Sequence, residues 1–228
     1  MITRVRLCFV LDCTGSMDPW LDQAKTRIRE MTNTIHREHP NTQIRVALVG
    51  YRDYDDDQRF HIVDFTTPEA VMAALRPLRA EGGDDEAEDV AHALRQAMGL
   101  EWDGDVNMIV HIADAPPHGR MYHHVSVSDR FPMGDPTGLD PRHSIHDMSE
   151  LGFTYTFVKI TDKTDTMLDV FHTAWTGRGE FKVIDLRPQH YDRSLGDPAN
   201  HDMASLLSPA VARAVSQTIT RYTDTQSV

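Results

Sequence analysis

The sequence predicts an α/β fold of the doubly wound, Rossmann-like type: a mostly parallel six-stranded sheet with one antiparallel edge strand and helices on both faces. Short apolar segments alternate with segments whose apolar residues recur every three or four positions, the pattern of alternating strands and helices. The first apolar segment is almost continuous, as expected for a strand buried on both faces of a parallel sheet. Polar turns directly follow two of the predicted strands.

The predicted strands are short apolar segments bounded by polar residues. They cover residues 4–11, 44–51, 60–65, 106–113, 153–160 and 181–186. We expect the first strand at the centre of the sheet. Only the short acidic loop around Asp55 joins the second and third strands. Because that loop is too short for a parallel crossover, the third strand is predicted to pair antiparallel, whereas the other connections can hold helices.

The predicted helices carry a stripe of apolar residues on one face. The clearest stripes lie within residues 21–35, 87–98 and 210–222. Ser208 and Pro209 have the character of an N-cap followed by a first-turn proline, and we therefore expect the last helix to begin there. Since no linker or internal repeat interrupts the pattern, we expect one domain over residues 1–223 and a frayed tail over residues 224–228.

Composition excludes several classes of partner. The formal net charge of −12 and the lack of a basic stripe argue against a nucleic acid. No segment approaches the roughly 20 apolar residues of a membrane span, so no membrane partner is expected. The N-terminus does not resemble a secretion signal. Cys8 and Cys13 are expected to be free thiols of the first strand and its loop, which favours the cytoplasm.

Oxygen-bearing side chains gather where two predicted strands end. Asp12, Thr14 and Ser16 follow the first strand, and Asp114 follows the strand at 106–113. In open α/β sheets, ligands bind beyond the carboxyl ends of the strands. Carboxylates and hydroxyls suit a hard cation that keeps some water, so we expect Mg²⁺ or Mn²⁺ with one position left for a ligand.

Asp12-x-Thr14-x-Ser16 resembles the Asp-x-Ser-x-Ser motif of von Willebrand factor A (VWA) domains. In that family a metal-ion-dependent adhesion site (MIDAS) also takes a threonine or glutamate from a second loop and an aspartate from a third. Asp114 matches the third element. The resemblance implies a non-enzymatic module that binds a protein partner through the metal, with an acidic residue of the partner filling the open position.

The second loop departs from the family's commoner Gly-Gly-Thr form, because Asp84 follows Gly82 and Gly83. Residues 85–88 are similar to the Asp-Ser-Pro-Glu stretch of integrin β inserted domains, which implies that Glu88 is the ligand, with Asp85 the next candidate. Blocks 50–53, 82–85 and 111–119 resemble the VWA module of certain α-kinases.

Two other interpretations remain open. The loop after the first strand is also similar to the phosphorylation loop of haloacid dehalogenase-type phosphatases, in which Asp12 would attack a phosphoryl group. That family needs a lysine followed by an acidic pair, whereas the candidate Lys159 follows Asp114. The other possibility is a scaffold whose metal site is vestigial.

Three further features belong to the surroundings of the site. The acidic residues at 53–57 are expected to form a solvated hairpin tip. The loop at 115–142 carries five prolines and no periodicity, so it is expected to supply specificity, and its Arg120, His118, His123 and His124 to offset the acidic charge. A transition-metal site at His118 and His123 is a secondary hypothesis. His111 is expected to be a core histidine.

Overall fold

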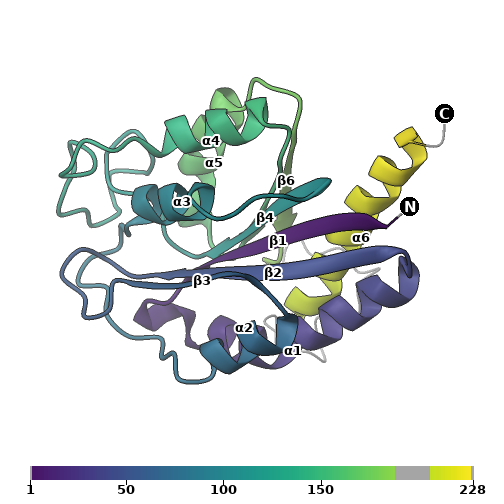
Figure 1. The fold of residues 1–228 in the computed structure, drawn as a ribbon. Helices are drawn as coiled ribbons and strands as arrows, with labels where there is room; N and C mark the ends of the chain where they lie inside the picture. Colours follow the sequence, from purple (N-terminus) through teal and green to yellow (C-terminus); the bar gives the residue numbers. More distant parts are fainter. Residues whose placement is uncertain (1, 188–205, 227–228) are drawn as a thin grey trace.

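A six-stranded sheet forms the middle layer of the computed structural model, which describes residues 2–187 and 206–226 (Figure 1). In spatial order the strands are β3 (Phe60–Thr66), β2 (Thr42–Tyr51), β1 (Thr3–Asp12), β4 (Val106–Ala113), β5 (Thr154–Lys159) and β6 (Glu180–Asp185). Among these strands, β3 alone pairs antiparallel. The predicted fold class, the central first strand and the antiparallel edge strand are all confirmed.

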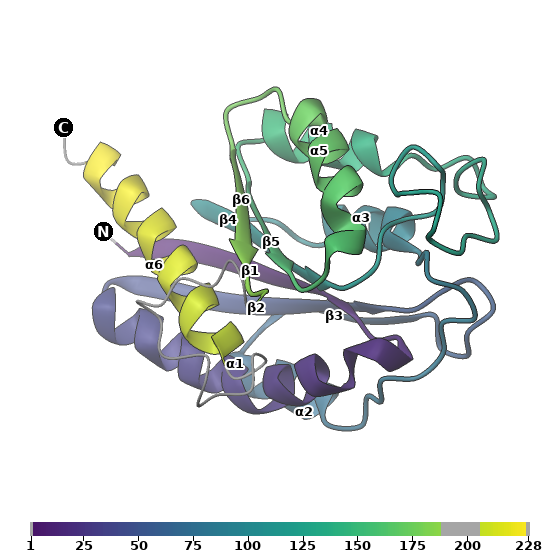
Figure 2. The same ribbon diagram turned by 180° about the vertical axis from the view of Figure 1, so that it is seen from behind.

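Helices cover both faces of the sheet. One face carries α1 (Asp18–Glu38), α2 (Pro68–Leu75) and α6 (Leu207–Gln226), and the other carries α3 (Val90–Met98), α4 (Pro141–Glu150) and α5 (Asp165–Ala174). Figure 2 shows α6 running beside α1 on the first face. Single-turn helices follow β1 and β5, namely η1 (Gly15–Met17) and η2 (Asp162–Thr164).

Alternation along β1 explains why the sheet is buried on both faces. Leu7, Phe9 and Leu11 pack into the core beneath α1, α2 and α6, while Cys8 and Val10 pack into the core beneath α3, α4 and α5. All five side chains are at most 2% exposed. Because both faces must be apolar, the strand carries the near-continuous apolar run that the sequence shows.

The predicted boundaries of the strands differ from those observed by at most two residues. The last helix differs from its predicted bounds at both ends. It begins at Leu207, so Ser208 lies inside the helix and not at its N-cap, because burial of Leu206 and Leu207 draws the first turn into the core. It continues through Gln226, so residues 224–226 are helical and not frayed, and residues 227–228 lie outside the described part. Among the described helices, none combines the length and apolar character needed to cross a membrane.

The pairing register places the site. Leu11 lies opposite Ile112 in the parallel pair of β1 and β4, so Asp12 and Asp114 follow neighbouring strands at the same edge of the sheet. The second loop, at residues 82–89, and the long loop after β4 also lie at this edge (Figure 1).

Candidate metal centre

Asp12 is the buried end of β1. Its side chain is inaccessible to solvent, and its Oδ1 accepts hydrogen bonds from the backbone N–H of Thr14 (2.9 Å) and from the Thr14 hydroxyl (2.7 Å). Its Oδ2 is buried without a hydrogen-bond partner. Directly afterwards the chain turns into η1, and the N–H of Gly15 donates to the carbonyl of Gly82 (3.2 Å), which ties the first loop to the second.

Glu88 is held in place by the segment that follows β4. Its N–H donates to the carbonyl of Pro116 (2.9 Å), and it forms an isolated parallel bridge with Pro117. The next residue, Asp89, caps α3 by accepting the N–H of His92 (3.2 Å). Glu88 is 3% exposed, and its Oε2 has no partner. The second loop is therefore fixed at its helical end, with one carboxylate oxygen left unpaired.

Asp114 directly follows β4 and is half-buried, with an unpartnered buried Oδ1. A pocket of about 140 Å³ lies between the loops. Of the predicted ligands, Thr14, Ser16, Glu88 and Asp114 line it, and Asp12 is joined to it through its hydrogen bonds to Thr14. The other residues that line it are Gly15, Gly82, Gly83, Asp85, Glu86, Ala115 and Lys163. The structure thus brings all five predicted residues to one place.

Burial and mutual repulsion raise the pKa values of two carboxyl groups at this pocket. Burial, followed by the charge of Asp114, raises the pKa of Asp12 to about 7. Burial, followed by the charge of Asp12, raises the pKa of Glu88 to about 10. Unpaired carboxylate oxygens in a buried site are unfavourable unless a cation or a proton compensates them. All of the donor atoms are oxygens, the ligand type that Mg²⁺ and Mn²⁺ accept, so the residues fit such an ion.

The three acidic candidates of the second loop occupy different positions. Glu88 and Asp85 line the pocket, whereas Asp84 does not. The carboxylate of Asp85 is turned toward the long loop, where its Oδ2 accepts the backbone N–H of Arg130. Glu88 is instead fixed through its backbone. Each residue keeps one buried carboxylate oxygen unpaired, Oε2 of Glu88 and Oδ1 of Asp85, but only the Asp85 carboxylate is anchored to the long loop. The geometry therefore favours Glu88 over Asp85, and both over Asp84.

Arg52, which the sequence interpretation missed, joins the loop after β1, the acidic hairpin and the segment before the second loop. It directly follows β2 and is 4% exposed. Its guanidinium donates to the carbonyls of Cys13 (3.3 Å), Asp57 (2.8 Å) and Arg79 (2.8 Å). A charged residue directly after an apolar strand, next to the acidic cluster, is the signal that could have found it.

The acidic hairpin is only partly the predicted solvated tip. Asp55 and Asp57 are exposed, but Asp53 is 5% exposed and bonded to Nε2 of His118 (2.8 Å). Asp56 accepts the N–H of Gly83 (3.1 Å) and so supports the second loop. The expectation was wrong for Asp53 because the long loop folds over the hairpin and removes that side chain from water.

The histidines of the long loop have different roles. His118 and His123 are buried, and both bond to Asp129, at 2.8 and 2.9 Å. His124 and Arg120 are exposed. The four basic residues therefore do not form one surface, because internal hydrogen bonds of the loop hold two of them inside it.

His111 is a core histidine, as predicted. It is fully buried in β4 and bonds to the hydroxyls of Tyr51 (3.0 Å) and Tyr155 (2.7 Å). Burial lowers the pKa of His111 to about 3, so the ring is neutral.

This chain belongs to the von Willebrand factor A domain family, whose sequence model matches residues 6–126. It is 35% identical over 172 residues to alpha-protein kinase vwkA of Dictyostelium discoideum. That alignment covers 73% of this chain and 27% of the kinase, so the chain spans about a quarter of its relative. The assignment favours the MIDAS-type interpretation of the Asp12 loop over the phosphotransfer one.

Solved structures of low sequence identity share the fold. The vWF domain of the type V pili tip protein Mfa5 from Porphyromonas gingivalis superposes with a TM-score of 0.58 at 14% identity, covering 96% of each chain. The pilus adhesin SpaC from Lactobacillus rhamnosus GG, in its open conformation, superposes with a TM-score of 0.60 at 13% identity. That match covers 94% of this chain and 30% of SpaC.

Proposed function

We propose that this domain is a protein-binding module that depends on a divalent cation, Mg²⁺ or Mn²⁺, held at a MIDAS-type site. The observation that carries the proposal is that each of the three predicted carboxylate ligands has a buried oxygen without a hydrogen-bond partner: Oδ2 of Asp12, Oε2 of Glu88 and Oδ1 of Asp114. A bound cation would compensate all three. When bound, it supplies an electrophilic centre for an anionic group of the partner.

The residues divide into two roles under this proposal. The hydroxyls of Thr14 and Ser16 bind the cation directly, and Asp12, Glu88 and Asp114 bind it directly or through water. Two carboxylates leave a divalent ion close to neutral, whereas three directly bound carboxylates would weaken its attraction for another anion. Some of the three therefore act through water, and an acidic residue of the partner completes the shell.

A positively charged side chain at the rim of the pocket would favour an anionic ligand. Lys163 lines the pocket and forms an exposed ion pair with Glu86. A partner carboxylate that reached the cation would also meet this ammonium group. Beside the pocket, the long loop presents its exposed residues, including Met121 and Val125 at 45% and 85% exposure, as a surface for selecting the partner.

We propose binding without catalysis. Asp12, the nucleophile of the phosphotransfer alternative, is fully buried, and the ammonium of Lys159 pairs with Asp165. Both cysteines are free and buried, consistent with the proposed cytoplasmic location.

The test is capture of partners on the immobilised domain from cells of its source organism, in Mg²⁺ and in chelator. Asp114→Asn removes one proposed ligand, and Asp84→Asn makes the same change at a neighbour outside the pocket. We expect capture by wild type and Asp84→Asn in Mg²⁺, and loss of capture in chelator or with Asp114→Asn. Replacing acidic residues of the captured partner should then remove binding. If chelation leaves the affinity unchanged while shortening of the long loop removes it, partner binding does not use the cation.

A further inference from the structure

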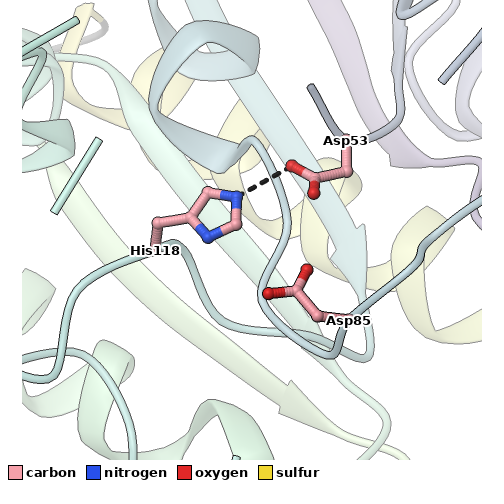
Figure 3. Close-up of side chains that lie close together, drawn as sticks. All are labelled: Asp53, Asp85 and His118. Atoms are coloured by element: carbon pink, nitrogen blue, oxygen red, sulfur yellow. Dashed lines mark hydrogen bonds and ion pairs between the residues drawn. The ribbon is translucent and has the colours of Figure 1, made fainter. Parts of the chain in front are cut away.

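A second group of potential ligands lies beside the first site. Figure 3 shows the side chains of Asp53, Asp85 and His118 converging from the hairpin after β2, the second loop and the long loop. One ligand atom from each lies within 4.8 Å of the other two. Ligand atoms about 2.1 Å from a common ion are separated by roughly 3–4 Å, so a small closure of these side chains would form a coordination shell.

We propose that Asp53, Asp85 and His118 form a second metal site, which binds a transition-metal cation such as Zn²⁺ and is distinct from the MIDAS-type site.

His118 is oriented as a ligand by a carboxylate behind it. Its Nδ1 lies 2.8 Å from Asp129, while its Nε2 faces Asp53. Asp129 is itself fixed by the backbone N–H groups of Gly119 and Phe131, both at 2.8 Å. A histidine that gives its Nδ1–H to a carboxylate keeps Nε2 for a metal, which is the usual arrangement around metal-binding imidazoles.

The ion pair between His118 and Asp53 does not account for the third side chain, Asp85. Pairing between His118 and Asp53 satisfies those two groups, but Oδ1 of Asp85 is buried with no hydrogen-bond partner. Its Oδ2 is anchored by the backbone N–H of Arg130, and the carboxylate as a whole lies beside the other two ligands (Figure 3). A cation bound here would compensate the unpartnered oxygen.

The ligand types indicate the kind of metal. One imidazole nitrogen with two carboxylates suits Zn²⁺ or Mn²⁺ better than Mg²⁺ or Ca²⁺, which prefer oxygen donors alone. The side chains of His118 and Asp53 are only 2% and 7% exposed, so the ligands are shielded from water. Because Asp85 also lines the first pocket, an ion here would join the long loop to both neighbouring loops at the wall of that pocket.

The test is calorimetric titration of Zn²⁺ into the domain in excess Mg²⁺, which keeps the first site filled if it binds Mg²⁺. Two pairs of variants are matched by residue type: His118→Gln with the exposed His124→Gln, and Asp53→Asn with the exposed Asp55→Asn. We expect one tight Zn²⁺ equivalent for wild type and both exposed controls, and its loss in His118→Gln and Asp53→Asn. Equal binding by all five proteins would overturn the proposal, as would the absence of a tight equivalent in wild type.

Two measurements keep the test decisive if a buried variant fails to fold. Asp85→Asn removes the charge of the unpartnered carboxylate and should lose the Zn²⁺ equivalent, whereas Asp12→Asn should keep it. Anomalous scattering at the zinc edge from crystals of the wild-type domain should show a peak bonded to Asp53, Asp85 and His118. A peak elsewhere, or loss of Zn²⁺ with Asp12→Asn and not with Asp85→Asn, would assign the ion to another site.

Discussion

Gly83 lies directly against the carboxylate of Glu88. A Cβ atom on Gly83 would be 2.9 Å from Oε1 of Glu88 and 3.3 Å from Cβ of Thr14, and the backbone at Gly83 has a φ of +83°. The second loop can pass between two proposed ligands because residue 83 has no side chain and tolerates this conformation. The second glycine of the Gly-Gly pair is therefore a spatial requirement of the site.

Replacing Gly83 with alanine should weaken cation binding by tenfold or more, about 1.4 kcal/mol, because the new methyl group displaces the Glu88 carboxylate. The left-handed backbone should also lower the free energy of unfolding by about 1–2 kcal/mol. Mg²⁺ titration by calorimetry and urea unfolding measure the two effects separately.

Gly152→Ala is the matched control, since Gly152 has a φ of +75° and a Cβ atom added to it would have no neighbouring atom within 4 Å. It should lose similar stability and keep its affinity for Mg²⁺. Equal affinity in Gly83→Ala and Gly152→Ala would show that Glu88 is not held by this contact.

Arg52→Lys should destabilise the domain by about 2–4 kcal/mol. Lysine cannot reproduce the guanidinium bonds to three separate carbonyls, and buried acceptors would lose their donors. Affinity for Mg²⁺ should fall too, because Arg52 ties the Cys13 carbonyl to the segment before the second loop. Arg120→Lys changes an exposed arginine in the same way and should stay within about 0.5 kcal/mol of wild type in urea unfolding.

His118 should make stability depend on pH in the metal-free domain. Burial lowers its pKa, but hydrogen bonds to Asp53 and Asp129 outweigh burial and raise the pKa from 6.5 to about 8. Between these values the folded protein holds a proton that the unfolded chain has released. The resulting stability is fully present below pH 6.5 and is lost as the pH rises through 8. His118 should contribute up to about 2 kcal/mol to the decrease that urea unfolding in chelator measures across this window.

His118→Gln should make that part of the profile shallower. A smaller decrease should remain in the variant, because the pKa of Glu88 is raised to about 10 and that of Asp12 to about 7, so both carboxyl groups also hold protons in the folded state within this window. If stability decreases between pH 6.5 and 8 by the same amount in His118→Gln and in wild type, the pH dependence does not come from this histidine.

His111 should not titrate between about pH 5 and 8, the range in which an ordinary imidazole changes charge. Its pKa of about 3 keeps the imidazole neutral between its two tyrosine hydroxyls. Nitrogen chemical shifts of the histidine rings provide the measurement. A His111 signal that moves with a midpoint near the ordinary value of about 6.5 would mean that the ring reaches water.

The fold was predictable because its signals are local. The apolar run of β1 and the spacing of apolar residues in α1 depend only on which faces are buried. Asp12 and Asp114 could be placed together because parallel strands end at one edge. The start of the last helix was less predictable, since it begins at the buried Leu207, one residue before Ser208, which the sequence predicted as the N-cap.

The surroundings of the site depend on contacts that are distant in sequence. His118 meets Asp53 across 65 positions, and Arg52 reaches Arg79 across 27. Neither pair has a local pattern, so the sequence could suggest only that each residue lies in a loop. The path of the long loop over the hairpin decides which of its histidines are buried.

The central claim is that the Asp12 loop binds Mg²⁺, and the most direct measurement is a calorimetric titration of Mg²⁺ into chelator-treated wild type, Asp12→Asn and the control Asp84→Asn. We expect one Mg²⁺ per chain for wild type and Asp84→Asn and none for Asp12→Asn, with all three folded by circular dichroism. Equal Mg²⁺ binding by wild type and Asp12→Asn would contradict the claim, because the ion would then associate only with the diffuse acidic surface.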